Sequence, residues 1–161
     1  MTTATDKILQ LEQLLTRLAD LRAEGKRVAL ANGLFDILHV GHLRYLEAAS
    51  EEADLLLVAV NSDRSARELK GPTRPVTPER ERAELVAGFG CVDLVTIFPE
   101  LTAESILRAV RPDVHCKGTD YTEATVPEAA VAQELKIRIA IVGDSKRHAT
   151  RDIITRLAKP D

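Results

Sequence analysis

The stretch Asn32-Gly33-Leu34-Phe35-Asp36-Ile37-Leu38-His39-Val40-Gly41-His42 decides how this chain folds. It follows the apolar run 28–31 and precedes a helix-like stretch at 43–49. The pattern therefore predicts a strand followed by a helix, with two histidines and a glycine at the junction. The unpaired N–H groups and the positive end of the helix dipole at such a junction favour an anion. We interpret the two imidazoles as additional donors to a phosphate chain.

The pattern His-x-Gly-His is short, and short patterns recur by chance. Taken alone, it favours histidines that cap a loop and a glycine in a turn over catalytic residues. Two commoner nucleotide signatures are absent from the sequence. No Gly-x-Gly-x-x-Gly follows the first predicted strand, and no Gly-Lys-Ser/Thr occurs. Both absences argue against a dehydrogenase and against a P-loop ATPase.

The composition fits one globular domain. The chain has 161 residues, of which 45% are hydrophobic, enough for a sizeable core. We expect residues 1–161 to form one domain, with an N-terminal helix in 1–25 and an α/β core in 26–161. A formal charge of −3 argues against nucleic-acid and membrane partners, although a local basic pocket is compatible with it.

The two cysteines and the apolar segments indicate the cellular compartment. Cys91 and Cys116 have no metal-ligand spacing, so we expect buried free thiols rather than a disulfide or a zinc site. The sequence shows no secretory signal and no apolar stretch long enough to span a bilayer. These features predict a cytoplasmic protein.

Apolar runs alternate with helical patterns along the chain, which predicts an α/β fold with a doubly wound parallel sheet of five strands. In such sheets, ligands bind beyond the carboxyl ends of the strands, where the strand order reverses. The stretch from Lys70 to Pro78 contains three prolines and is predicted to be a mobile loop. Strands are predicted at 28–31, 55–60, 92–98, 113–116 and 137–142, and helices at 6–23, 42–49, 78–88, 103–110, 126–135 and 150–158.

The pattern at 32–42 resembles the signature of the cytidylyltransferase-like nucleotidyltransferases. The resemblance continues in the same order through blocks at 60–63, 69–75, 81–84, 91–95 and 111–121. Within this superfamily the chain is most similar to the heptose-1-phosphate adenylyltransferase domain, which makes ADP-heptose for lipopolysaccharide core synthesis. The resemblance implies a Rossmann-like strand order of 3-2-1-4-5, which would place the loops at 32–42 and 117–121 on either side of one crevice.

The reaction implied by the resemblance is attack by a sugar phosphate on the α-phosphorus of a nucleoside triphosphate, with release of pyrophosphate. Because the nucleophile is already anionic, the protein needs no general base and must position two polyanions. Triphosphate chemistry leads us to expect Mg²⁺. ATP and heptose 1-phosphate are the leading substrates.

Two alternative functions stay open at this point. A cytidylyltransferase acting on glycerol 3-phosphate or another small phosphate or phosphonate is the first. A catalytically inactive nucleotide-binding regulatory module is the second, and it belongs to another class. The family also suggests a homodimer.

The resemblance assigns roles to particular residues, with His42 nearest the α-phosphate. Asp36 could instead cap a turn, and Lys70 could be a solvated loop lysine. Arg82 could lie on an exposed helix face, and no residue is a secure metal ligand. Catalytic roles are implied for His39, His42 and Lys70. Nucleotide binding is implied for Asn32, Gly33, Leu34, Phe35, Gly41, Arg82, Lys117, Gly118, Asp120 and Thr150, and acceptor binding for Asp36, Lys117, Asp120 and Tyr121.

The C-terminal part departs from the family pattern. The last helix of the superfamily usually starts with a Ser-Thr-Thr/Ser triplet, whereas this chain has Ala149-Thr150-Arg151. Only Thr150 keeps a hydroxyl at the predicted helix start. The basic residues at 146–148 and Arg151 either replace the lost hydroxyl contacts with positive charge or form a solvated loop. This departure leaves the base and the acceptor undetermined.

Overall fold

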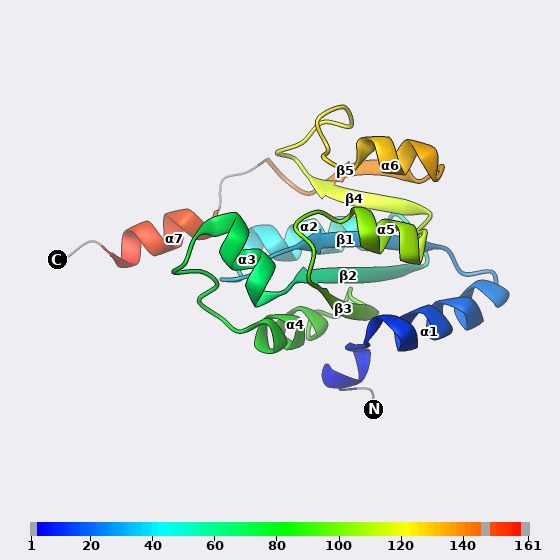
Figure 1. The fold of residues 1–161 in the computed structure, drawn as a ribbon, viewed down its shortest axis with the longest axis horizontal. Coiled ribbons are helices and arrows are strands. Elements are labelled where there is room, and N and C mark those ends of the chain that lie inside the picture. The colour runs from blue at the N-terminus through cyan, green and yellow to red at the C-terminus, as the bar shows by residue number, and fades with distance from the viewer. Residues whose placement is uncertain (1–2, 146–148, 159–161) are drawn as a thin grey trace.

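Five parallel strands form one sheet in the order β3-β2-β1-β4-β5 in the computed structural model, which describes residues 3–145 and 149–158 (Figure 1). The predicted doubly wound α/β fold and its strand order are confirmed. The order reverses between β1 and β4, which are neighbours in the sheet although β2 and β3 lie between them in the chain. The strands are β1 (Val28–Gly33), β2 (Leu55–Asn61), β3 (Leu94–Phe98), β4 (Val114–Gly118) and β5 (Arg138–Val142).

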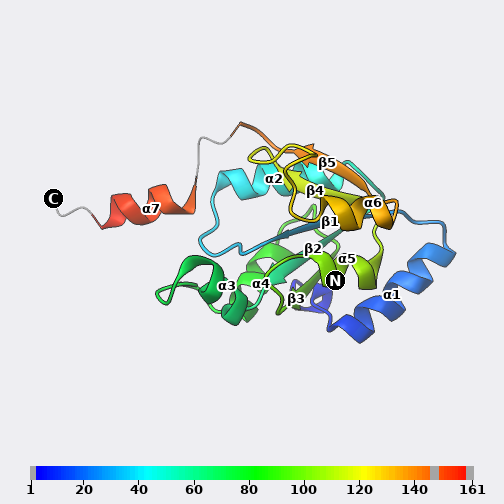
Figure 2. The same cartoon turned by 45° about the horizontal axis from the view of Figure 1, so that its top comes forward.

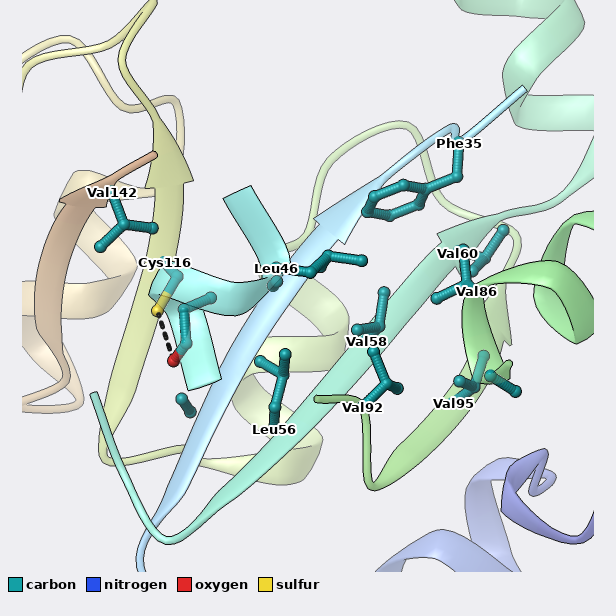
Figure 3. Packing of buried hydrophobic residues seen from close by; sticks show 14 of the residues in the cluster. Phe35, Leu46, Leu56, Val58, Val60, Val86, Val92, Val95, Cys116 and Val142 are labelled. Atoms are coloured by element: carbon teal, nitrogen blue, oxygen red, sulfur yellow. Dashed lines mark hydrogen bonds between the residues drawn. The ribbon is translucent and has the colours of Figure 1, made fainter. Parts of the chain in front are cut away.

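Helices cover both faces of the sheet (Figures 1 and 2). The helices α2 (Val40–Ser50) and α4 (Glu79–Ala87) pack on one face. The helices α1 (Leu11–Ala23), α5 (Glu104–Val110) and α6 (Ala129–Glu134) pack on the other. The strands are therefore apolar on both sides, as expected for a covered parallel sheet. Figure 3 shows the core under α2 and α4, where Leu46 and Val86 lie with Val58 of β2.

The N-terminal segment differs from the prediction of one helix over 6–23. A short 3-10 turn, η1, occupies Thr5–Lys7, and Ile8 then forms a bridge with Val95 of β3. The N–H of Leu9 donates to the carbonyl of Val95 at 2.9 Å. The helix starts only at Leu11, because the open edge of β3 takes up the residues before it. Helical periodicity in the sequence does not detect such an edge contact.

The helix α3 (Asp63–Lys70) was not predicted from the sequence. Ser62 caps its start, because the Ser62 hydroxyl accepts a hydrogen bond from the N–H of Ser65 at 3.2 Å. The helix is mostly polar and buries only Ser65 and Ala66, so it has no apolar stripe for a periodicity search to find. Lys70 is therefore the last residue of a helix, and the irregular stretch covers 71–78.

Two further features concern the cysteines and the C-terminal helix. Cys91 and Cys116 are free thiols as expected, but only Cys116 is buried, and Cys91 is half-buried. The helix α7 (Thr150–Leu157) extends away from the sheet in both views (Figures 1 and 2). Within 3–145 and 149–158, no helix has the length and apolar character needed to cross a membrane.

Candidate active site

A cleft of about 1040 Å³ opens at the carboxyl ends of the strands. Residues after β1, β2, β4 and β5 line it, as expected for an open α/β sheet. The two loops predicted to flank one crevice both line this cleft. All but one of the residues to which the resemblance assigned a role line it too, namely Asn32, Gly33, Leu34, Phe35, Asp36, His39, Gly41, His42, Lys70, Lys117, Gly118, Asp120, Tyr121 and Thr150.

The two histidines of the motif form the N-terminal cap of α2. The N–H of Gly41 donates to Nδ1 of His39 at 3.1 Å, and the N–H of His39 donates to Nδ1 of His42 at 3.3 Å. Both Nδ1 atoms are thus acceptors, which places the proton of each neutral ring on Nε2. The rings lie side by side with centroids 4.0 Å apart. The cap therefore presents imidazoles as N–H donors at the positive end of a helix.

Asn32 is oriented by a buried histidine that the sequence did not single out. His115 is fully buried, and its Nε2 lies 2.9 Å from Oδ1 of Asn32. Burial, with a smaller contribution from the nearby Lys117 cation, lowers the pKa of His115 to about 4, so the ring is neutral near pH 7. In the neutral ring, Nε2 acts as the donor to Oδ1. The amide N–H groups of Asn32 can then donate hydrogen bonds to an anionic ligand in the cleft.

Asp36 anchors the stretch 71–78 to the motif loop. Its carboxylate forms an ion pair with Arg74 and accepts hydrogen bonds from the N–H groups of Val76 and Thr77, both at 2.9 Å. Burial tends to raise the pKa of Asp36, but the hydrogen bonds from Thr77, Val76 and Arg74 together lower it. The carboxylate is thus occupied by the protein. This arrangement supports the structural alternative for Asp36 over acceptor binding.

Arg82 is not among the residues that line the cleft, so its predicted contact with nucleotide stays a prediction. Its side chain is fully buried. Its guanidinium donates to the carbonyls of Leu34 and Thr77, at 2.5 and 2.8 Å, and forms an ion pair with Asp63 at 2.8 Å. The exposed-face alternative is wrong. Arg82 thus joins the motif loop, the 71–78 stretch and α3.

Lys117 lies at the end of β4 beside a buried acid, Glu128, that the sequence analysis missed. Lys117 is 7% and Glu128 is 2% exposed, and Nζ of Lys117 is 3.7 Å from Oε2 of Glu128. Nζ also lies 4.7 Å from the centroid of the Tyr121 ring. Burial lowers the pKa of Lys117, and Glu128 partly opposes that effect. The polar stretch before Glu128 carries no pattern that marks a buried acid.

The remaining predicted residues lie around the rim of the cleft. Lys70 is exposed at the end of α3. Thr150 begins α7, and its hydroxyl donates to the carbonyl of Ile37 at 3.1 Å, which ties this helix to the motif loop. Arg151 also lines the cleft. Lys146, Arg147 and His148 lie outside the described residues.

The side chains around the cleft do not form a dedicated metal site. In the part of the chain that the structure describes, no group of three or more His, Cys, Asp or Glu residues could hold a metal ion. Asp36 already has its oxygens bound by Arg74, Val76 and Thr77. The described residues therefore do not fit a resident metal.

The chain matches a known protein family over most of its length. Residues 30–156 match the model of the cytidylyltransferase-like family. Bifunctional protein HldE of Methylobacillus flagellatus is 42% identical over 153 residues, which are 95% of this chain and 31% of that protein. HldE of Pseudomonas entomophila is 41% identical, over 94% of this chain and 32% of that protein. This chain thus spans about a third of the length of these curated relatives.

Two solved structures share the fold. The lipopolysaccharide core biosynthesis protein from Thermoplasma volcanium superposes with a TM-score of 0.65 and 27% identity, covering 76% of this chain and 100% of that one. Pantoate-beta-alanine ligase from Francisella tularensis, crystallised with beta-gamma ATP and beta-alanine, superposes with a TM-score of 0.60. The superposition covers 92% of this chain and 76% of the ligase chain. At 14% identity, it shows a shared fold alone.

Proposed function

Because this chain belongs to the cytidylyltransferase-like family, we propose that it transfers a nucleoside monophosphate from a nucleoside triphosphate to a sugar phosphate and releases pyrophosphate. The specific reaction we propose is formation of ADP-heptose from ATP and heptose 1-phosphate. The identity to proteins named HldE over most of this chain supports it, as does the likeness to the Thermoplasma volcanium lipopolysaccharide core biosynthesis protein.

The observation that carries the proposal is the histidine cap of α2. Nδ1 of each ring accepts a backbone N–H, so both rings have a fixed orientation and a proton on Nε2. Donors that are oriented before the ligand arrives stabilise the charge that develops during phosphoryl transfer without further reorganisation. We assign the contact with the α-phosphate to His42, and His39 donates to the same triphosphate.

The rest of the chemistry requires positioning of two anions. The acceptor oxygen attacks the α-phosphorus, the bond to the bridging oxygen breaks, and the electron pair leaves with pyrophosphate. Lys70, on the rim of the cleft, supplies positive charge to the leaving phosphates. The amide nitrogen of Asn32 and the N–H groups at the start of α2 add neutral donors. No proton has to be removed from a phosphate nucleophile, so no general base is assigned.

The metal ion, the cellular location and the oligomeric state of this chain remain predictions. We expect Mg²⁺ to arrive with the triphosphate and to keep several waters. The cytoplasmic location and the homodimer also remain predictions.

The test is pyrophosphate release with a panel of substrates. The purified chain is assayed with ATP or CTP against heptose 1-phosphate, glycerol 3-phosphate and a phosphonate, with Mg²⁺ present. We expect turnover with ATP and heptose 1-phosphate to exceed every other pair. Faster turnover with CTP and a polyol phosphate would establish the cytidylyltransferase alternative. Nucleotide binding without turnover on any acceptor would establish the regulatory module.

A further inference from the structure

The buried pair of Lys117 and Glu128 lines the cleft, yet the proposed phosphate chemistry does not use Glu128. We infer that this pair is the subsite for hydroxyl groups of the acceptor, and that the acceptor's phosphate binds elsewhere in the cleft. The inference rests on the proposed function and deepens it, because it defines the acceptor as a polyhydroxylated phosphate ester. It also changes the role of Lys117, which the resemblance had assigned to nucleotide and acceptor binding without a partner acid.

Glu128 has one carboxylate oxygen bound and one without a hydrogen bond. Oε1 accepts the N–H of Ala103, at the start of α5, at 3.0 Å. Oε2 is buried and accepts no hydrogen bond from any described residue. A buried acceptor without a donor is unfavourable, because it has lost its hydrogen bonds to water. A ligand that brings an O–H to Oε2 removes that cost, so this oxygen favours a hydrogen-bond donor.

Lys117 supplies the complementary group. Its Nζ is 3.7 Å from Oε2 of Glu128, which is a Coulombic contact and too long for a hydrogen bond. Its Nζ also lies over the face of the Tyr121 ring, 4.7 Å from the centroid. An ammonium group has three N–H donors. A donor and an acceptor thus lie side by side in the wall of the cleft, and a hydroxyl group, which both donates and accepts, matches the pair.

A phosphate matches this pair poorly. Its oxygens only accept when fully ionised, so they would satisfy Lys117 but face the carboxylate of Glu128. Like charges this close in a buried site repel strongly. Because the pair is neutral as a whole, it does not attract a polyanion. Glu128 therefore selects the neutral body of an acceptor over a second phosphate.

The sheet places the pair apart from the histidines. Ala31 of β1 pairs with Cys116 of β4, so Asn32 and Lys117 are the next residues along these neighbouring strands. Cys116 packs in the core under α2, and alternation along a strand directs Lys117 to the opposite face, toward α5 and α6. The histidines begin α2. An acceptor lying across the edge of the sheet thus directs its phosphate to the histidines and its hydroxyl groups toward Lys117 and Glu128.

The test is equilibrium binding of two probes to the whole chain. Heptose 1-phosphate carries the hydroxyl groups, and methyl phosphate carries only the phosphate. Glu128→Gln keeps an oxygen for the N–H of Ala103 and replaces the Oε2 acceptor with a donor. We expect this variant to weaken binding of heptose 1-phosphate by about tenfold or more, the usual size for a lost hydrogen bond to a charged group. Binding of methyl phosphate should change by less than about twofold, because no phosphate contact is lost.

The matched control is Glu134→Gln, which changes the exposed last acid of α6, the helix that follows Glu128, and this acid is paired with Arg108. It should leave both affinities unchanged. Equal weakening of both probes by Glu128→Gln would overturn the inference, and so would unchanged or tighter binding of heptose 1-phosphate. A wild-type chain that binds heptose 1-phosphate no more tightly than methyl phosphate would overturn it as well.

A second variant covers the case in which Glu128→Gln does not fold. Lys117→Met should weaken the binding of heptose 1-phosphate and leave the binding of methyl phosphate unchanged. If Lys117 instead binds the phosphate, this variant should weaken the binding of both probes. Titration requires no turnover, so it decides the inference even when the chain is inactive. Pyrophosphate release by the wild-type chain decides the proposed function separately.

Discussion

Two buried cations, Lys117 in the wall of the cleft and Arg82 behind Leu34, differ in how completely the protein pairs them. Arg82, beneath the 71–78 stretch, donates to two carbonyls and forms an ion pair with Asp63 at 2.8 Å. Lys117, at the end of β4, has its nearest acid at 3.7 Å, and one oxygen of that acid accepts no hydrogen bond from the described residues.

The difference separates a residue that holds the fold together, Arg82, from a residue that binds ligand, Lys117. The Arg82 guanidinium is satisfied by the folded chain, and removing it takes a donor from the carbonyls of Leu34 and Thr77 and from the carboxylate of Asp63. Lys117 and Glu128 are incompletely satisfied in the folded chain, so a ligand can improve their hydrogen bonding. Both cations belong to sequence blocks that resemble the family, and the sequence did not distinguish them. Their hydrogen bonds and ion pairs in the folded chain distinguish them.

The largest expected effect is the loss of turnover when His42, which lines the cleft, is replaced. His42→Asn keeps an oxygen near the position of Nδ1 to accept the N–H of His39, but it removes the Nε2 donor. We expect kcat to fall by about 10²–10³-fold, as for the loss of one transition-state donor, with little change in the free energy of unfolding. His42→Gln, which can place an amide N–H near Nε2, should recover part of the rate. Near-normal turnover of His42→Asn would contradict the assigned role.

The scaffold side of the comparison is tested by Arg82→Ala. Because Asp63 and the carbonyls of Leu34 and Thr77 lose their donor, we expect the free energy of unfolding to fall by about 3 kcal/mol. Urea denaturation measures the change. The exposed neighbour Arg80 gives the control, since Arg80→Ala should cost less than about 0.5 kcal/mol. A small effect at Arg82 would show that its contacts are not structural.

His115 makes the free energy of unfolding sensitive to moderate acid. Its pKa of about 4 in the folded chain lies below the ordinary value of 6.5. Between these values only the unfolded chain takes up the proton, so stability decreases as the pH falls from about 6.5 toward 4. His115→Gln keeps a donor for Asn32 and cannot titrate. Its free energy of unfolding should therefore depend less on pH in this window, and an unchanged pH dependence would exclude His115 as the source.

A paired replacement should separate stability from binding. Lys117→Met with Glu128→Gln removes both charges together, so no buried charge is left alone. We expect the free energy of unfolding to stay within about 1 kcal/mol of the wild-type value, with loss of preference for heptose 1-phosphate over methyl phosphate. Denaturation and titration measure the two effects. A large loss of stability would place Lys117 with Arg82 in the scaffold.

The smallest expected effect is the acid response of Asp36. Its pKa is lowered in the folded chain, so the stability it contributes is present above its ordinary value of 3.8 and is lost as the pH falls through the lower folded value. Asp36→Asn should be less stable near pH 7 and should lose less stability at low pH. Urea denaturation across this range measures it. Equal acid sensitivity in both proteins would contradict the anchoring role.

The sequence by itself determined the sheet, because strands covered on both faces are continuous apolar runs, and each run is visible in the residues themselves. It also determined the motif at 32–42, whose residues lie close together in the chain. It missed α3, whose polar sequence has no stripe, and the contact of Ile8 with the edge of β3.

Only the tertiary structure decided the state of the charged residues. Arg82 meets Leu34 across 48 positions of the chain, and Asp36 meets Arg74 across 38. Glu128 is buried because the segment after β4 brings it against the start of α5. Burial and pairing of a charge depend on which distant segments fold around it, and local patterns in the sequence carry no record of those neighbours.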